Sequence, residues 1–361
     1  RQFRGFFKVS RQFSDEERSD DMKAIILIGG FGTRLRPLTC NTPKPLLPVL
    51  NKPFSLYQIE LLKKYGIKEI ILCMAYLPSE FKKYFGDGKK FGVKISYAVE
   101  KTPLGTGGAI KNAEKFVNDS VIIFNGDVLT EINLSKLIQF HKNKKSKATI
   151  SLVSVPDPTS FGLVETAKDG KILQFLEKPS LNQITCDTIN AGTYIFEPEI
   201  FKEMPPDIVY SVERELFPTL LNKKIPFYGY IYSAYWIDIG TTEKYLQVHN
   251  DLMNRMKKNV IGKNSKIAKS VRIFGHLVVG DNTQISEKTT IYGNVCLGNN
   301  IKIGGGCFLS DCVILDKTIL DEGSKIEKSL VGKNCIIEEN AHLMAGCVVG
   351  DKTVVRRYSK L

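Results

Sequence analysis

The chain has 361 residues, of which 43% are hydrophobic and 25% are charged, and its formal net charge at pH 7 is +13. This length is sufficient for two domains with a sizeable core, and no apolar stretch reaches the length of a membrane span or of a secretory signal. The Lys and Arg residues are scattered and form no basic stripe with interleaved aromatics, which argues against a nucleic-acid partner and favours a small anionic substrate.

The first 21 residues precede Met22 and differ in composition from the rest of the chain. We expect residues 1–21 to be a disordered or non-native extension and Met22 to be the functional start. The eight cysteines include no CxxC pair and no histidine at metal-ligand spacing. They therefore indicate reduced cysteines in a cytoplasmic protein rather than a disulfide framework or a zinc site.

A glycine-rich loop comes after the first predicted strand. Ala24–Ile28 is a continuous apolar run, which is typical of a strand buried on both faces of a parallel sheet. Three glycines come directly after it, where backbone N–H groups can approach a phosphate closely: Gly29, Gly30 and Gly32. Three cations come next, the last of them between two prolines: Arg34, Arg36 and Lys44. The loop is predicted to bind a polyphosphate, although it is neither a P-loop nor a GxGxxG motif.

Strands and helices alternate between residues 55 and 258. Helical periodicity covers Ser55–Tyr65, and a last helix runs from Thr242 to about Lys258. Apolar runs predict further strands at Glu69–Ala75, Val93–Val99, Val121–Phe124, Ala148–Val155, Gly192–Phe196 and Phe227–Tyr232. This alternation is typical of βαβ units and of a Rossmann-like, mostly parallel sheet. Residues 22–258 are therefore predicted to form one α/β domain.

The pattern changes at Ile261, from which aliphatic residues recur every six positions. They are Ile261, Ile267, Ile273, Val279, Ile285, Ile291, Leu297, Ile303, Leu309 and Leu315. After two five-residue steps the spacing resumes at Ile337, Leu343 and Val349. This period marks a solenoid whose short strands form the sides of a triangular coil. It resembles the hexapeptide repeats of left-handed parallel β-helices, so residues 259–361 are predicted to form such a domain.

The glycine-rich loop also resembles a known family signature. GGFGTRLRPLT…PKPLLPV is similar to the signature of the nucleotide-sugar pyrophosphorylases, which are sugar-1-phosphate nucleotidyltransferases. EKTPLGTGG, SVERELFP and YWIDIGTTEKYL resemble the mannose-1-phosphate guanylyltransferase branch in particular. The resemblance implies an enzyme that transfers a nucleoside monophosphate from a nucleoside triphosphate to a sugar 1-phosphate and releases pyrophosphate. The expected substrates are GTP and mannose 1-phosphate.

Such a transfer needs cations and backbone donors more than a general base, because the attacking phosphate oxygen is already anionic. The resemblance implies that Arg34 and Lys44 are the catalytic cations at the phosphates. The implied nucleotide-binding residues are Gly29, Gly30, Gly32, Thr33, Arg36, Glu100, Gly105 and Thr106. The implied sugar-phosphate-binding residues are Gly162, Glu177, Lys178, Asn190 and Gly192. Among these, Lys178 is expected to pair with the phosphate of the sugar.

Two aspartates are predicted to hold Mg²⁺. Asp127 ends the strand-like segment VIIFNGD, and ligands of α/β sheets gather beyond the carboxyl ends of strands. Asp238 lies in AYWIDIG. Two carboxylates completed by phosphate oxygens and water suit Mg²⁺. Aspartates in matching contexts hold the ion in the family that the chain resembles.

Glu100 is the candidate for selecting the base. Guanine offers N1–H and its N2 amino group on one edge, and a carboxylate can accept hydrogen bonds from both. Uracil and thymine present only N3–H between two carbonyls, so Glu100 favours GTP.

Several alternatives stay open at this point. Within the class, the chain could be a thymidylyl-, uridylyl- or adenylyltransferase acting on glucose 1-phosphate, or a heptose-1-phosphate guanylyltransferase. From another class, it could be a non-catalytic regulatory or scaffold relative. His276 and His342 in the repeats make a second, acyltransferase activity conceivable. We expect a homo-oligomer without nucleic-acid or membrane partners, because β-helices often pack side by side.

Overall fold

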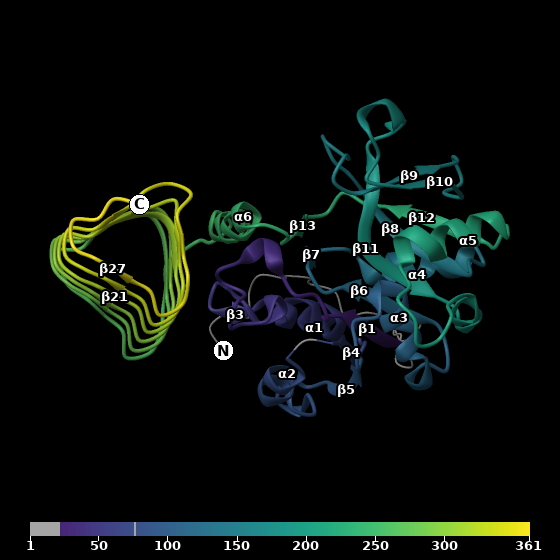
Figure 1. Cartoon of the computed structure of the whole chain (residues 1–361), viewed down its shortest axis with the longest axis horizontal. Helices are drawn as coiled ribbons and strands as arrows, with labels where there is room; N and C mark the ends of the chain where they lie inside the picture. The colour runs from purple at the N-terminus through teal and green to yellow at the C-terminus, as the bar shows by residue number, and fades with distance from the viewer. Residues whose placement is uncertain (1–21, 76) are drawn as a thin grey trace. The chain divides into compact units, whose positions relative to one another are not determined.

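The computed structural model describes residues 22–75 and 77–361 (Figure 1). The expectation for residues 1–21 lies outside these described residues. The described chain divides into two compact units that do not follow chain order, and each is described by itself. The sheet unit consists of residues 22–30 and Ser55–Ile237, and the β-helix unit consists of Phe31–Phe54 and Asp238–Leu361. The domain boundary at residue 258 stays a prediction.

The sheet unit is built on a nine-stranded mixed sheet, in which β8 and β12 join the path β10-β9-β11-β6-β1-β4-β5 through β11. Its strands are β1 (Lys23–Leu27), β4 (Glu69–Met74), β5 (Lys94–Val99), β6 (Val121–Asn125), β8 (Ala148–Ser154), β9 (Gly162–Thr166), β10 (Ile172–Glu177), β11 (Thr188–Phe196) and β12 (Phe227–Ile231). A separate pair is formed by β7 (Val128–Thr130) and β13 (Trp236–Asp238). The predicted Rossmann-like sheet is confirmed: β1 pairs in parallel with β4 and β6, whereas β11 runs antiparallel to β6 and β8.

Helices connect these strands. The α-helices are α1 (Phe54–Lys64), α2 (Pro78–Phe85), α3 (Gly105–Asn112), α4 (Leu134–Asn143) and α5 (Phe217–Asn222). Shorter helices are η4 (Lys89–Phe91), η5 (Glu114–Phe116), η6 (Leu181–Gln183), η7 (Pro198–Glu203) and the π-helix η8 (Val212–Leu216). The apolar runs are buried because the sheet is covered: Ile25, Ile123 and Tyr194 are fully inaccessible and lie in one core cluster.

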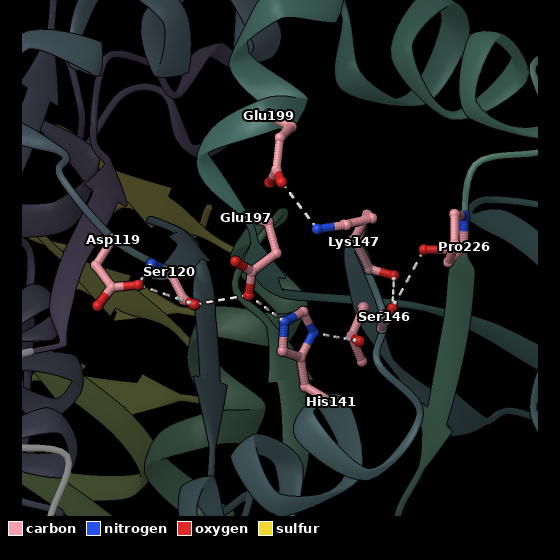
Figure 2. Close-up of polar contacts among 10 residues, drawn as sticks. Asp119, Ser120, His141, Ser146, Lys147, Glu197, Glu199 and Pro226 are labelled. Atoms are coloured by element: carbon pink, nitrogen blue, oxygen red, sulfur yellow. Dashed lines mark hydrogen bonds and ion pairs between the residues drawn. The ribbon is translucent and has the colours of Figure 1, made fainter.

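A polar network ties α4 to the sheet, as Figure 2 shows. The buried His141 contacts Thr149 Oγ1 on β8 with Nδ1, at 2.7 Å, and Glu197 Oε1 with Nε2, at 2.9 Å. The Ser120 hydroxyl donates to the same Glu197 oxygen at 2.6 Å. Burial lowers the pKa of His141 although Glu197 acts in the opposite direction. The network joins segments far apart in sequence through side chains with several partners each.

The β-helix unit contains the predicted solenoid. One sheet has the strand order β14-β16-β18-β20-β22-β25, and β23 and β26 are attached to it through β20. The other sheet has the strand order β15-β17-β19-β21-β24-β27. All pairings in both sheets are parallel. The strands are β14 (Val260–Ile261), β15 (Lys266–Ile267), β16 (Arg272–Val279), β17 (Gln284–Ile285), β18 (Thr290–Leu297), β19 (Lys302–Ile303), β20 (Phe308–Ile314), β21 (Ile319–Leu320), β22 (Lys325–Glu327), β23 (Leu330–Val331), β24 (Ile336–Ile337), β25 (His342–Leu343), β26 (Val348–Val349) and β27 (Val354–Val355). Figure 1 shows the coils end-on as stacked triangles, coloured from green to yellow, which is consistent with a left-handed β-helix.

The repeat pattern is confirmed with one correction. Stacked aliphatics fill the interior, and Ile291, Leu309, Ile326 and Leu343 follow one another in register. In the structure the first five-residue step runs from Leu309 to Ile314, because the register with β18 shifts between Tyr292 and Val295. Ile314, not Leu315, then pairs with Leu297 and continues the interior column. One residue fewer in that coil advances the inward-facing position, so Leu315 falls one place after it.

The rest of the β-helix unit consists of the cation loop, which is residues 31–54, and of α6 (Thr242–Met253). The cation loop contains η2 (Thr33–Leu35), η3 (Lys44–Leu46) and a hairpin of β2 (Pro48–Val49) and β3 (Lys52–Pro53). Helix α6 begins after Thr241, whose hydroxyl accepts from Lys244 N–H, and ends before Asn254, earlier than predicted. Within the described ranges, no helix has the length and apolar character that crossing a membrane requires.

Candidate active site

The predicted site residues fall in both units. In the sheet unit lie Gly29, Gly30, Glu100, Gly105, Thr106, Asp127, Gly162, Glu177, Lys178, Asn190 and Gly192. In the β-helix unit lie Gly32, Thr33, Arg34, Arg36, Lys44 and Asp238. The structure brings several of them together within each unit, and their roles in binding stay predictions.

Glu100 lies beside the first glycine of the loop. Its N–H donates to the Met74 carbonyl at 2.9 Å, so the end of β5 holds it against the end of β4. A Cβ placed on Gly29 would lie 3.6 Å from Glu100 Oε1 and 3.3 Å from the Ala75 nitrogen. A side chain at Gly29 would thus be in ordinary contact with this carboxylate and would crowd only the Ala75 backbone.

The Glu100 carboxylate is buried and tied at one oxygen. Its exposed fraction is 7%, and Oε2 accepts a hydrogen bond from Leu104 N–H at 2.8 Å. Burial raises the pKa of Glu100, and the hydrogen bond from Leu104 acts in the opposite direction. The other oxygen, Oε1, lies toward Gly29. The structure thus presents a fixed acceptor at the end of two parallel strands.

The glycine-rich start of α3 packs on residues 210–213. Gly105 has a φ of +73°, and a Cβ there would lie 2.8 Å from the Tyr210 carbonyl oxygen. The Thr106 hydroxyl donates to Glu213 Oε2 at 2.8 Å and accepts from Val212 N–H at 2.9 Å. Thr106 therefore joins α3 to η8, two segments more than a hundred residues apart in the sequence. No sequence motif predicted this contact.

Gly162 and Glu177 are paired across β9 and β10. A Cβ on Gly162 would lie 3.2 Å from Glu177 Oε2. Burial raises the pKa of Glu177, and the nearby charge of Glu213 acts in the same direction while Lys178 opposes it. Lys178 itself has a φ of +52°, and its N–H donates to the Phe161 carbonyl at 2.9 Å. The structure therefore gathers Gly162, Glu177 and Lys178 at one end of the β9–β10 pair.

Asn190 and Gly192 lie at an irregularity of β11, where its register with β8 shifts between Asn190 and Tyr194. Asn190 Nδ2 and Asn125 Nδ2 donate to the Tyr194 hydroxyl at 3.0 and 3.2 Å. Asn190 Oδ1 accepts from Gly192 N–H at 2.9 Å. Burial raises the pKa of Tyr194, and the charge of Asp127 also contributes to this rise. Sequence analysis missed Tyr194 as the centre of this cluster; the only signal was a Tyr directly after the NAGT string.

A cavity of about 450 Å³ lies in the same unit. It lies between the ends of β8 and β12 and the segment that leads to β13, and Trp236 is part of its wall. The Trp236 indole N–H donates to the Ala191 carbonyl at 2.9 Å, and its ring meets Phe161 edge-on at 5.6 Å between centroids. An amphipathic wall of this kind suits a small polar ligand.

In the β-helix unit, the cation loop closes on itself at Gly32. This residue has a φ of +63°, and its carbonyl accepts from the Thr39 hydroxyl at 2.7 Å. A Cβ on Gly32 would lie 2.9 Å from Lys44 Cβ. The contact brings Lys44 next to η2, which carries Thr33 and Arg34.

Asp238 and Arg34 meet at Gly240. A Cβ on Gly240 would lie 2.9 Å from Asp238 Oδ2 and 3.2 Å from Arg34 Nη2, so both groups border the space that glycine leaves open. Lys244, from the first turn of α6, forms an ion pair with Asp238 Oδ1. Lys244 was not predicted. Within residues 22–75 and 77–361, no three His, Cys, Asp or Glu side chains gather as a metal site, and the metal site stays a prediction.

Comparison with protein families assigns both parts of the chain. Residues 23–255 match the family described as nucleotidyl transferase, and residues 273–359 match the GMPPB C-terminal domain.

Individual relatives are similar over different lengths. A mannose-1-phosphate guanylyltransferase of Mycobacterium tuberculosis is 43% identical over 232 residues, which is 64% of each chain. A UTP–glucose-1-phosphate uridylyltransferase of Synechocystis is 32% identical over 352 residues, 93% of this chain and 88% of the relative. Among solved structures, HddC from Yersinia pseudotuberculosis complexed with GMP-PN has a TM-score of 0.55 and 32% identity, covering 64% of this chain and 99% of that one.

Proposed function

The chain belongs to the nucleotidyl transferase family, and from this membership we propose that it transfers GMP from GTP to mannose 1-phosphate with release of pyrophosphate. The observation that carries the choice of base is the buried Glu100 carboxylate, held by Leu104 N–H beside Gly29. The similarity to a mannose-1-phosphate guanylyltransferase supports the choice of sugar.

In this reaction a bond forms between the phosphate oxygen of mannose 1-phosphate and the α-phosphorus of GTP. The bond from that phosphorus to the bridging oxygen of the leaving pyrophosphate breaks. The attacking oxygen is already an anion, so the protein has to align two anions and neutralise the charge that develops on pyrophosphate. Arg34 and Lys44 supply that positive charge from a loop that folds back so that Lys44 packs against Gly32.

Glu100 would accept hydrogen bonds from guanine N1–H and N2–H. Its Oε1 lies toward Gly29 while Oε2 retains the Leu104 hydrogen bond, which limits rotation of the carboxylate. Hydrogen bonds to a charged acceptor are stronger than neutral ones, so the preference for guanine is expected to be large.

For the sugar phosphate we propose Lys178 as the partner of the phosphate, with Glu177, Asn190, Gly162 and Gly192 around the hydroxyls. The clustering of Gly162, Glu177 and Lys178 supports this assignment.

We propose that Asp127 and Asp238 hold a divalent cation, Mg²⁺, when substrates bind. Their hard carboxylate oxygens fit this ion, and the space beside Asp238 Oδ2 that Gly240 leaves open supports the assignment. The bound ion would neutralise part of the charge of the triphosphate. Arg34 and Lys244, which border Asp238, would hold its carboxylate in position.

A second candidate is uridylyl transfer from UTP to glucose 1-phosphate, because the Synechocystis relative is similar over nearly the whole chain. The Glu100 carboxylate argues against uridylyl transfer. Uracil has a carbonyl oxygen on either side of its single N3–H donor, so one of these oxygens would face a carboxylate oxygen.

The test is pyrophosphate release with Mg²⁺, with GTP and UTP each crossed with mannose 1-phosphate and glucose 1-phosphate. We expect release with GTP and mannose 1-phosphate, and its loss in Arg34→Ala. Release confined to UTP and glucose 1-phosphate would replace the proposal with the second candidate. Absence of pyrophosphate release by the wild-type chain with all four substrate pairs would refute both candidate functions.

We also propose a cytoplasmic, homo-oligomeric protein. The eight cysteines are free, and Cys307 and Cys335 lie in the β-helix interior, in agreement with a reducing environment. Light scattering of the purified chain tests the oligomer, and a monomeric mass would refute it.

A further inference from the structure

The cation loop rests along one corner of the β-helix. Leu297, Ile314, Val331 and Val349 form one column of paired residues in successive coils. Residues at this column or one or two positions after it contact the loop in three different coils: Leu297, Lys333 and Gly350. The loop is thus supported at three points by repeats that come 246 or more residues later in the sequence.

The first contact is made by the tip of the β2–β3 hairpin. Leu50 and Asn51 both have positive φ, 46° and 63°, which is the backbone of a two-residue type I′ turn. This turn places the Asn51 side chain on the β-helix, where Nδ2 donates to the Leu297 carbonyl at 2.7 Å. The carbonyl belongs to the last residue of β18.

The second contact uses a lysine of the repeats. Lys333 Nζ donates to the hydroxyl of Thr42 at 3.1 Å, and Thr42 is only 9% exposed. The Lys333 backbone N–H donates to Asp351 Oδ1 at 2.8 Å, so the residue is fixed at both ends. Thr42 directly precedes the segment Pro43–Lys44.

The third contact is one of packing. A Cβ on Gly350 would lie 3.0 Å from Pro37 Cβ, so the proline ring packs closely on this coil. Pro37 follows Arg36 and lies three residues after Arg34. The contacts at Thr42 and Asn51 therefore lie on either side of Lys44, and the contact at Pro37 follows Arg34 by three residues.

We infer that the β-helix positions the catalytic cations, with Asn51 and Lys333 as positioning residues for the transfer reaction. They touch no substrate in this scheme; they hold the loop that carries Arg34 and Lys44. The expected effect on kcat rests on the proposed function, whereas the expected ordering of the loop by these contacts does not. Each hydrogen bond removes open conformations of the loop, which matters because misplaced charge stabilises the leaving group less.

The chain offers a matched control. Lys263 stands in the same Gly-Lys-Asn context as Lys333, and its N–H donates to Asp281 Oδ1 as that of Lys333 does to Asp351. Lys263 is exposed and belongs to the first coil. Lys333→Met and Lys263→Met therefore remove the same charge from equivalent places in the repeat. Asn51→Gly removes the other side chain and keeps the positive φ accessible.

The primary measurement is amide hydrogen exchange of the full-length chain in peptides that span residues 31–54. We expect exchange in this segment to rise about fivefold in Lys333→Met and in Asn51→Gly, as the loss of one hydrogen bond predicts. Lys263→Met should match wild type, and Lys333→Arg should restore protection. Unchanged exchange in both loop variants, or an equal rise in Lys263→Met, would overturn the inference whether or not the chain has the proposed activity.

The second measurement separates positioning from folding. With the substrates that the wild type turns over, Lys333→Met should lower kcat several-fold at nearly unchanged thermal midpoint, and Lys333→Arg should recover most of kcat. A fall in the thermal midpoint with unchanged kcat would show a purely structural contact and refute the positioning role.

Discussion

Acidification should destabilise the β-helix unit through one buried histidine on α6. His249 is 1% exposed, and its Nδ1 lies 2.8 Å from the Tyr245 carbonyl oxygen. A carbonyl only accepts, so Nδ1 carries the hydrogen and the neutral ring keeps its lone pair on Nε2. Burial lowers the pKa of His249 to about 4. Protonation would place a charge inside the unit, because the second proton has to enter at Nε2.

The direction of the effect is set by proton binding. The unfolded chain binds a proton at this histidine near pH 6.5, whereas the folded chain does so only near pH 4. The unfolded state therefore holds more protons between these values, and the free energy of unfolding falls as pH falls through this window. The pKa difference corresponds to a maximal loss of about 3.4 kcal/mol, of which about 2 kcal/mol is reached between pH 7 and pH 5.

The assay is urea unfolding followed by circular dichroism at pH 7 and pH 5, for wild type and for His249→Asn. The asparagine amide can still donate to the Tyr245 carbonyl but does not titrate. Wild type should lose about 2 kcal/mol more than the variant on acidification. Other groups, including His141, titrate in both proteins and cancel in the comparison. Equal losses in the two proteins would refute the argument for a buried neutral His249.

Three further predictions concern the site. Glu100→Gln should reduce the preference of kcat/KM for GTP over UTP by about 10- to 100-fold, since hydrogen bonds to a charged acceptor contribute about 1.5–3 kcal/mol; an unaltered ratio would remove Glu100 from base selection. Asp238→Asn is isosteric and should abolish Mg²⁺-dependent turnover while circular dichroism shows an intact fold; full turnover would exclude Asp238 as a metal ligand. Gly32→Ala should lower the free energy of unfolding by about 1–2 kcal/mol, because φ is +63° and the new Cβ would meet Lys44. Gly30→Ala, where a Cβ would meet no atom within 4 Å, is the control in the same unfolding experiment, and equal losses would contradict the strain at Gly32.

Local sequence patterns were sufficient to predict the kind of secondary structure in each unit. The six-residue period predicted the β-helix because each short strand of a coil must turn an aliphatic side chain toward the interior. This requirement recurs once per strand along the chain. Apolar runs such as Ile70–Met74 predicted buried parallel strands for the same reason, since both faces of the sheet are covered. Residue type also indicated chemistry: glycines beside cations for phosphates, and carboxylates at strand ends for a metal ion.

The tertiary structure alone decided which of these residues are neighbours. That Glu100 lies against Gly29, that Asn190 and Asn125 share the Tyr194 hydroxyl, and that Lys333 reaches Thr42 depends on the path of the chain between them. The same holds for the interior position of Ile314. The six-residue period predicted Leu315 there, but the pairing of β18 with β20 places Ile314 opposite Leu297. Periodicity reports whether a side chain is buried, which is a local property of the chain. It does not report the partner, because contacts between distant residues are selected by the packing of whole elements.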